Sequence, residues 1–364
     1  MVEIDTDFSE HQPMNTTYQD TEIHFLNVGH GDCTIIRHAS GRITMIDINN
    51  GQDYDPDTKR ELDDTKTIRK SELARRRSLW AALGVRIDEA REAAGGFASE
   101  LTDPVKYFLE HWPGQSIFRF ILTHPDFDHI RGLHRLRAAG VAIENFWDTD
   151  HEIEKTNLAE ADLEDWNQYE MLRAGKDGAR VFRPVRGESK KYWSEDDAGG
   201  NGDGLWILAP TPELRAAADK GEDPNAHSLV LHLTANGIRL VLGGDATKAV
   251  LQDVFNAFGI NLDCHIYKAA HHGRESGYCM EALRAMAPKY TIVSVGQRPS
   301  TDASQKYQYF ADQNAGEVLS TRFHGDIVVR INSAGTYSIE TEETRKAAQE
   351  ARFRALAPLL GLRR

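Results

Sequence analysis

The chain has 364 residues, of which 40% are hydrophobic and 27% are charged, a composition typical of a globular protein with a substantial core. Its 56 acidic residues outnumber its 43 basic residues, so the formal net charge is −13. This balance disfavours a general nucleic-acid coat protein, whose surface is basic, although divalent cations bound in one cleft can reverse the local potential.

Three further features concern the cellular compartment. No stretch is as long and apolar as a membrane span, and residues 1–20 lack the apolar segment of a signal peptide. The three cysteines, Cys33, Cys264 and Cys279, are too few for a disulfide framework and fit a reducing compartment. We therefore expect a cytoplasmic protein that does not associate with a membrane.

The chain begins with a polar, acidic stretch at 1–20 that we expect to be disordered. Three short apolar segments at 21–28, 33–37 and 42–48 then predict a β-meander. Asp32 lies in a glycine-flanked turn and Asp47 near the end of the third strand. Turn chemistry or a strand end alone can account for either carboxylate.

Two polar segments interrupt the pattern of short strands. Residues 52–113 are charged and helical in pattern, and include the basic run at 75–77. A solvated helix face is the simpler interpretation of that run, and a phosphate-contacting patch the sharper one. Residues 150–203 are polar and helical at 158–174. We expect both to be peripheral insertions that border the site as a rim or lid, with possible contacts to a protein partner.

The most informative stretch is 118–136. Its first residues predict a buried strand, and 130–136 predict a helix. Between them, His124-Pro125-Asp126-Phe127-Asp128-His129 places four metal-binding side chains in a tight loop. Neighbouring carboxylates repel unless a cation lies between them, and open α/β sheets bind ligands at the carboxyl ends of their strands. The stretch therefore predicts a metal site.

The later chain alternates short strands and helices. Strands are expected at 143–147, 205–208, 228–234, 238–242, 263–267, 290–295, 318–321, 326–331 and 336–341. Helices are expected at 246–258, 281–286 and 307–314, with a C-terminal helix within 342–364 and a proline-containing loop at 209–225. This order predicts one α/β domain at 21–341, built as two face-to-face sheets with helices outside, an αββα sandwich.

More metal-binding side chains lie at the ends of these later strands. The donors for one ion would be His124, Asp126 and His227, and those for the other would be Asp128, His129 and one of His271 and His272, with Asp245 as the bridge. Seven donors suit two divalent cations that share a carboxylate and a water. Mixed nitrogen and oxygen donors suit Zn, Mn or Fe, and the carboxylate share favours Mn over Zn.

Each group also has a simpler explanation. His227 could be an exposed polar residue, Asp245 the N-cap of the following helix, and His271 and His272 buried hydrogen-bond donors. Several independent explanations are less economical than one metal centre, so we favour the metal centre.

These motifs resemble the metallo-β-lactamase superfamily, whose HxHxDH loop appears as His124, Asp126, Asp128 and His129. Its later His, its Gly-Asp and its final His resemble His227, Asp245 and His271/His272. The segments 25–32 and 270–273 are similar to the ComEC-type branch, the hydrolase domain of DNA-uptake proteins and its free-standing relatives. Two departures are Asp126 in place of a second His, and His30 where Gln is usual.

The resemblance implies a dinuclear metal-dependent phosphodiester hydrolase with two Mn or Zn ions, in which a bridging hydroxide attacks phosphorus. Asp128 would also orient the water. Whichever of His271 and His272 is not a ligand would contact the phosphate or protonate the leaving oxygen. Asp32 and Asp47 would orient ligand imidazoles.

The substrate that the resemblance implies is single-stranded DNA or RNA. The acidic composition favours an alternative, a small phosphodiester such as a cyclic nucleotide or a choline phosphoester. A regulatory module with a vestigial site is a further alternative, against which the complete ligand set argues. The sequence predicts neither the substrate contacts nor the oligomeric state.

Overall fold

The computed structural model describes residues 20–50, 101–156, 158–195, 202–221, 223–294 and 303–342, together with 344, 345 and 348. The basic run at 75–77, most of the segment 52–113 and most of the predicted C-terminal helix lie outside the described residues. So do residues 1–19 of the predicted disordered N-terminus.

The described strands form two mixed sheets. The first contains β1 (Thr21–Phe25), β2 (Thr34–Arg37), β3 (Ile43–Ile46), β4 (Ile117–Ile121), β5 (Ile143–Trp147), β6 (Arg180–Phe182), β13 (Ile327–Ile331) and β14 (Tyr337–Thr341). The second contains β7 (Leu205–Ala209), β8 (Val230–Ala235), β9 (Ile238–Leu242), β10 (Ile266–Lys268), β11 (Tyr290–Val293) and β12 (Glu317–Ser320). Their orders are β14-β13-β1-β2-β3-β4-β5-β6 and β12-β11-β10-β9-β8-β7.

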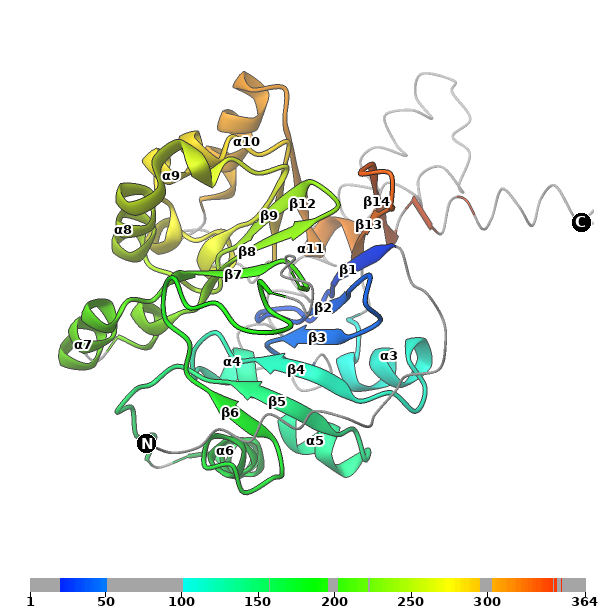
Figure 1. The fold of residues 1–364 in the computed structure, drawn as a ribbon, viewed down its shortest axis with the longest axis vertical. Helices are drawn as coiled ribbons and strands as arrows, with labels where there is room; N and C mark the ends of the chain where they lie inside the picture. The colour runs from blue at the N-terminus through cyan, green and yellow to red at the C-terminus, as the bar shows by residue number, and fades with distance from the viewer. Residues whose placement is uncertain are drawn as a thin grey trace, which may run out of the picture.

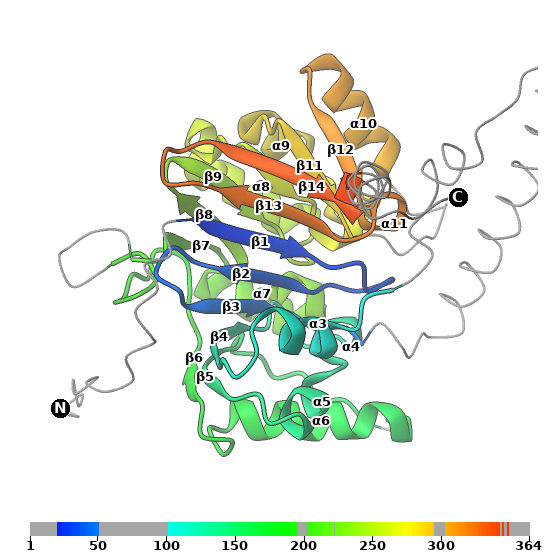
Figure 2. The ribbon, with the colours of Figure 1, turned by 90° about the vertical axis from the view of Figure 1, so that its right-hand side faces the viewer.

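Helices cover the outer faces of both sheets (Figures 1 and 2). The α-helices are α3 (Pro104–His111), α4 (Phe127–Ile130), α5 (Leu133–Ala138), α6 (Glu160–Arg173), α7 (Pro212–Gly221), α8 (Lys248–Phe258), α9 (Met280–Met286), α10 (Ser304–Gln313) and α11 (Thr321–His324). Four short 3-10 helices in the described residues are η1 (Pro224–His227), η2 (Gly259–Leu262), η3 (Ala270–Gly273) and η4 (Glu275–Gly277). None of the described helices is long and apolar enough to cross a membrane.

The core has three apolar layers. The middle layer joins the inner faces of the two sheets and includes Phe25, Leu231 and Leu240. One outer layer packs α3, α5 and α6 on the larger sheet, and the other packs α8, α9 and α10 on the smaller sheet. Burial of each large aliphatic side chain contributes about 1.5–3 kcal/mol, so these layers are the main source of stability. The predicted αββα sandwich is confirmed.

The two polar segments contribute more to the core than expected. Phe108 and Trp112, at the end of the first segment, are buried against the larger sheet. The second segment supplies α6, whose Tyr169 is buried, and the edge strand β6, which pairs in parallel with β5. The expectation that both segments are peripheral is therefore wrong for these parts, because helices within them bury large side chains against an apolar sheet face.

The segment predicted as a loop at 209–225 also differs from the structure. It contains the helix α7, in which Pro212 is the first residue. Proline is tolerated at the first position of a helix, because the amide it lacks has no intrahelical acceptor there. Pro212 therefore marks where this helix begins and does not exclude it.

Candidate metal centre

Four side chains from three loops converge at one end of the sandwich. Ligand atoms of Asp128, His129, Asp245 and His272 all lie within 4.8 Å of one another. Asp245 Oδ2 is 3.4 Å from His129 Nε2 and 3.2 Å from His272 Nε2. Asp128 Oδ2 is 3.3 Å from His272 Nε2. We call these four residues the Asp128 side of the centre.

Main-chain hydrogen bonds hold these loops together. The amide of Ile48, just after β3, donates to the carbonyl of His129 at 2.9 Å. The amide of His271 donates to the carbonyl of Gly244 at 2.9 Å, which joins the ends of β10 and β9. Because β9 and β10 are parallel neighbours, as are β3 and β4, their carboxyl ends place these loops side by side.

Asp245 is free to face the centre. Thr247, and not Asp245, caps α8, because its side chain accepts a hydrogen bond from the amide of Val250. The explanation of Asp245 as a helix cap is therefore wrong. Its backbone amide instead donates to Ser228 Oγ at 3.1 Å, which ties the β9 loop to the start of β8.

The adjacent histidines lie in η3, beyond the end of β10, and not at the strand end as expected. Their φ angles are 51° at His271 and 53° at His272, and Gly273 follows with 74°. This left-handed backbone buries the His272 imidazole in the Asp128 side. His271 lies at the edge, where its Nε2 is 3.8 Å from Asp245 Oδ2 and its Nδ1 is 2.8 Å from Ser276 Oγ.

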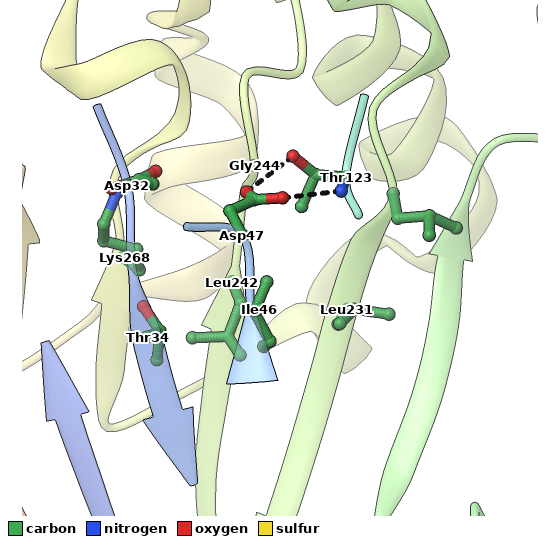
Figure 3. A pocket seen from close by; sticks show the side chains of 10 residues that line it. Asp32, Thr34, Ile46, Asp47, Thr123, Leu231, Leu242, Gly244 and Lys268 are labelled. Atoms are coloured by element: carbon green, nitrogen blue, oxygen red, sulfur yellow. Dashed lines mark hydrogen bonds and ion pairs between the residues drawn. The ribbon is translucent and has the colours of Figure 1, made fainter. Parts of the chain in front are cut away.

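Asp47 lies behind His129. Its Oδ2 is 2.8 Å from His129 Nδ1, and its carboxylate also accepts hydrogen bonds from the amide and the hydroxyl of Thr123 (Figure 3). These contacts turn the opposite ring nitrogen, Nε2, toward Asp245. This is the geometry that the predicted orienting role of Asp47 requires.

Asp32 is paired with a lysine, and its ligand atom lies within 4.8 Å of those of Asp47 and His129, so its orienting role stays a prediction. Its Oδ2 accepts a hydrogen bond from Lys268 Nζ at 2.8 Å, and no hydrogen bond joins it to an imidazole among the described residues. Burial opposes ionisation of this carboxyl, but the Lys268 ammonium keeps its pKa below the usual value. The pair lies beside a small cavity between the sheets, which Leu231 and Leu242 line from below (Figure 3).

His124, Asp126 and His227 are the predicted ligands of the other ion, and we call these three residues the His227 side. His124 Nε2 is 3.5 Å from Asp126 Oδ2, and both histidines are fully buried. These three residues do not form a group within 4.8 Å among the described residues. Instead, Asp126 Oδ1 accepts from Lys155 Nζ at 2.6 Å, and Asp219 Oδ1 lies 3.1 Å from His227 Nε2.

On the Asp128 side, imidazoles and carboxylates face one another and shift each other's pKa values. Burial alone would lower the pKa of His272, but the carboxylates of Asp245 and Asp128 raise it to about 9. The pKa of His129 is also raised against burial, with Asp245 and Asp47 as the main causes. Conversely, the imidazoles hold the pKa of Asp128 well below its usual range despite burial. A bound cation would take the place of the imidazole protons.

The residues present fit metal ions. Several buried ligand atoms form no hydrogen bond in the described structure, although carboxylate oxygens lie 3.1–3.5 Å from the four nitrogens. They are Nε2 of His124, His129, His227 and His272, and Oδ1 of Asp245. A buried polar atom without a partner costs about 1–3 kcal/mol, and coordination of a cation would remove that cost. Imidazole and carboxylate donors together suit Zn, Mn or Fe.

Sequence reasoning missed several residues at the centre. Arg274 Nη2 donates to His30 Nε2 at 2.8 Å, and His30 Nε2 is also 3.4 Å from Asp128 Oδ2. Gly31 allows this approach, because a Cβ there would lie 2.5 Å from the carbonyl oxygen of Asp128. His30 stood out as a departure from the family motif. Asp219, Lys155 and Arg274 carried no comparable signal, since they lie in or beside segments interpreted as loops.

Comparisons with known proteins give partial matches. No family model matches the chain. The "Competence protein ComA" of Neisseria gonorrhoeae is 30% identical over 83 residues, which are 23% of this chain and 12% of that protein. A mutant of the β-hydroxylase CmlA is 12% identical, with a TM-score of 0.47, and the match covers 88% of this chain and 55% of the other. The diiron β-hydroxylase CmlA of Streptomyces venezuelae is 14% identical, with a TM-score of 0.45 and coverages of 87% and 55%.

The chain thus spans about half the length of the two matched structures and a small part of the competence protein. Membership of the ComEC-type branch stays a prediction.

Proposed function

We propose that the chain is a phosphodiester hydrolase that depends on two divalent metal ions. The observation that carries this proposal is the Asp128 side, where His129, His272 and Asp245 are buried and face the partly exposed Asp128 carboxylate. Nε2 of both imidazoles and Oδ1 of Asp245 have no hydrogen-bond partner among the described residues. A cluster of this kind is costly unless it binds a cation, and a site beside strand ends is accessible to a substrate.

In this proposal Asp128, His129 and His272 would hold one ion, His124, Asp126 and His227 would hold the other, and Asp245 would be the ligand shared by the two sides. The ions, when bound, supply an activated water at neutral pH and positive charge for the phosphoryl oxygens. The side chain of Asp128 is 21% exposed, so its carboxylate can also accept a hydrogen bond from that water and orient it. Asp47 keeps Nε2 of His129 directed at the centre.

His271 then contacts the substrate. Ser276 holds its Nδ1, which leaves Nε2 facing the centre from the edge. Of the two roles considered for the residue that is not a ligand, we propose the contact to the phosphate, because Ser276 fixes the orientation of the ring with Nε2 directed at the centre.

We propose single-stranded nucleic acid as the substrate, supported by the motif resemblance and by the similarity to a competence protein. A small phosphodiester is the second candidate, because the net charge of −13 would repel a long polyanion outside the metal centre.

One assay series tests the function. The protein, loaded with Mn or Zn, is incubated with bis(p-nitrophenyl) phosphate, single- and double-stranded DNA, RNA and cyclic nucleotides, and a chelated sample serves as the control. We expect two bound ions per chain and hydrolysis of at least one substrate. Failure to bind a transition metal after supplementation, with no hydrolysis, would instead support the regulatory module with a vestigial site.

A further inference from the structure

Arg274 carries a positive charge that the described residues do not neutralise. Its guanidinium approaches two imidazoles, at 2.8 Å from His30 Nε2 and 3.5 Å from His271 Nε2. Its Nε is buried and has no hydrogen-bond partner in the described structure. No carboxylate among the described residues forms an ion pair with it, although Asp128 and Asp245 lie just beyond the two imidazoles. A half-buried cation without a counter-ion is costly and needs a reason.

The position of the guanidinium indicates that reason. The two Nε2 atoms that it approaches are also the atoms that face Asp128 Oδ2, at 3.4 Å, and Asp245 Oδ2, at 3.8 Å. Arg274 is therefore separated from the metal centre by one layer of imidazoles, and its partly exposed side chain borders the outside. The planar fork of arginine matches two oxygens of a phosphate, which a lysine ammonium does not.

We infer that Arg274, oriented by His30, binds an anionic phosphate oxygen of the substrate at the edge of the metal centre. The inference rests on the proposed function and narrows its substrate. A fixed positive charge at this place favours nucleotide and nucleic-acid phosphates. It disfavours choline phosphoesters, because a quaternary ammonium group would be repelled by the guanidinium.

The first test is equilibrium binding of inorganic phosphate to Mn-loaded protein by calorimetry, because it needs no turnover. We expect Arg274→Ala to weaken phosphate binding by roughly 10-fold to 100-fold, the usual worth of a charge-assisted hydrogen bond. The affinity of Arg274→Lys for phosphate should lie between those of the unchanged protein and Arg274→Ala, since lysine keeps the positive charge but not the planar fork of the guanidinium. Arg284→Ala, on the exposed face of α9, is the matched control and should bind phosphate as the unchanged protein does.

The second test compares substrates of different charge. In Arg274→Ala the KM for bis(p-nitrophenyl) phosphate should rise about 10-fold. The KM for p-nitrophenyl phosphorylcholine should rise less, because relief of the repulsion between the guanidinium and the quaternary ammonium group offsets the lost phosphate contact. Metal content of each variant is measured in parallel. If Arg274→Ala loses metal, Arg274 is structural and the inference is wrong. If Arg274→Ala does not fold, the folded variant Arg274→Lys decides the test. A match of Arg274→Lys to the unchanged protein in all measurements would also overturn the inference.

The two proposals fail in different ways. A protein that hydrolyses phosphodiesters, but binds phosphate equally well with and without Arg274, would overturn the inference and leave the proposed function intact. A protein that hydrolyses none of the phosphodiesters, yet loses phosphate binding in Arg274→Ala, would overturn the proposed function and keep Arg274 as an anion-binding residue.

Discussion

The two sides of the metal centre are built differently. On the Asp128 side, imidazole and carboxylate atoms already lie within 4.8 Å of one another, held by main-chain bonds between neighbouring strand ends. On the His227 side, Asp126 is paired with Lys155 and His227 faces Asp219. An ion can enter the first side without displacing a salt bridge to lysine, whereas the second must give up such internal partners. Preorganisation of this kind strengthens binding, so we expect the Asp128 side to bind its ion more tightly.

Replacement of the shared carboxylate should have the largest effect. Asp245→Ala removes the oxygen around which Nε2 of His129 and His272 gather, so we expect the loss of both ions. Elemental analysis after gel filtration measures the metal content. Asp312→Ala, an exposed change on α10, is the control and should keep both ions. Retention of two ions by the Asp245 variant would show that this carboxylate does not join the two sides.

A change behind His129 should weaken one side alone. Asp47→Asn replaces the oxygen that accepts from His129 Nδ1 with a group that can donate. We expect metal affinity on the Asp128 side to fall by about 10-fold to 100-fold, the usual effect of losing a partner behind a ligand. Titration calorimetry with Mn resolves the two binding events. An equal loss at both events would contradict the separation of the two sides.

Removal of the lysine should strengthen the other side. Lys155→Met frees the Asp126 carboxylate from the ammonium, which competes with a metal ion for the same oxygens. Both side chains are partly exposed, at 19% and 27%, so solvent moderates the gain. We expect the weaker ion to bind about 10-fold more tightly. Lys176→Met on the surface serves as the control, and unchanged binding in Lys155→Met would show that the ammonium does not compete.

The smallest effect concerns the support of the His227 side. The imidazole of His151 lies beside that of His227, and Tyr169 OH links it to buried Asp148. Burial raises the pKa of Asp148 to about 6, although Arg173 and Tyr169 oppose the shift. Between the ordinary pKa of an aspartate and this raised pKa, the folded state therefore binds more protons than the unfolded state. The free energy of unfolding should fall as the pH rises through that interval, up to about 6.

Urea unfolding of the protein and of Asp148→Asn across pH measures this contribution. The difference between the two should change by about 1 kcal/mol between pH 5 and pH 7.5, because the amide cannot ionise. A constant difference would mean that Asp148 titrates at its ordinary pKa.

The site was easier to predict than its surroundings, for physical reasons. The loop from His124 to His129 follows a strand of apolar residues, and that contrast marks a strand end in any sequence. Asp219 has no such contrast, because it lies on α7 in a proline-containing stretch and meets His227 only through folding. Likewise β6, with three residues at a sheet edge, has too short a pattern to stand out.

The order of strands and helices predicted the sandwich. Segments with the apolar spacing of strands form the sheets, and segments with the apolar spacing of helices form the layers that cover them. The role of the polar segments was not predictable in the same way. Trp166 and Tyr169 are buried against α5 and the larger sheet, yet the surrounding residues of α6 are mostly charged or polar. A few large aromatic side chains bury enough area to anchor such a helix. They are easily overlooked when the polarity of the whole segment is considered.

The backbone of η3 limits which atoms can serve as donors at the centre. Positive φ angles are tolerated by glycine and, among other residues, most readily by asparagine, aspartate and histidine, while β-branched side chains are strongly disfavoured. At His271 and His272, with φ of 51° and 53°, the donor side chains that the turn accepts most readily are thus histidine, asparagine and aspartate, which carry nitrogen or oxygen. Exchange of donors at this turn, by natural variation or by redesign, would therefore retain the hard to borderline character of the ligands and keep the centre away from thiolate-bound metals.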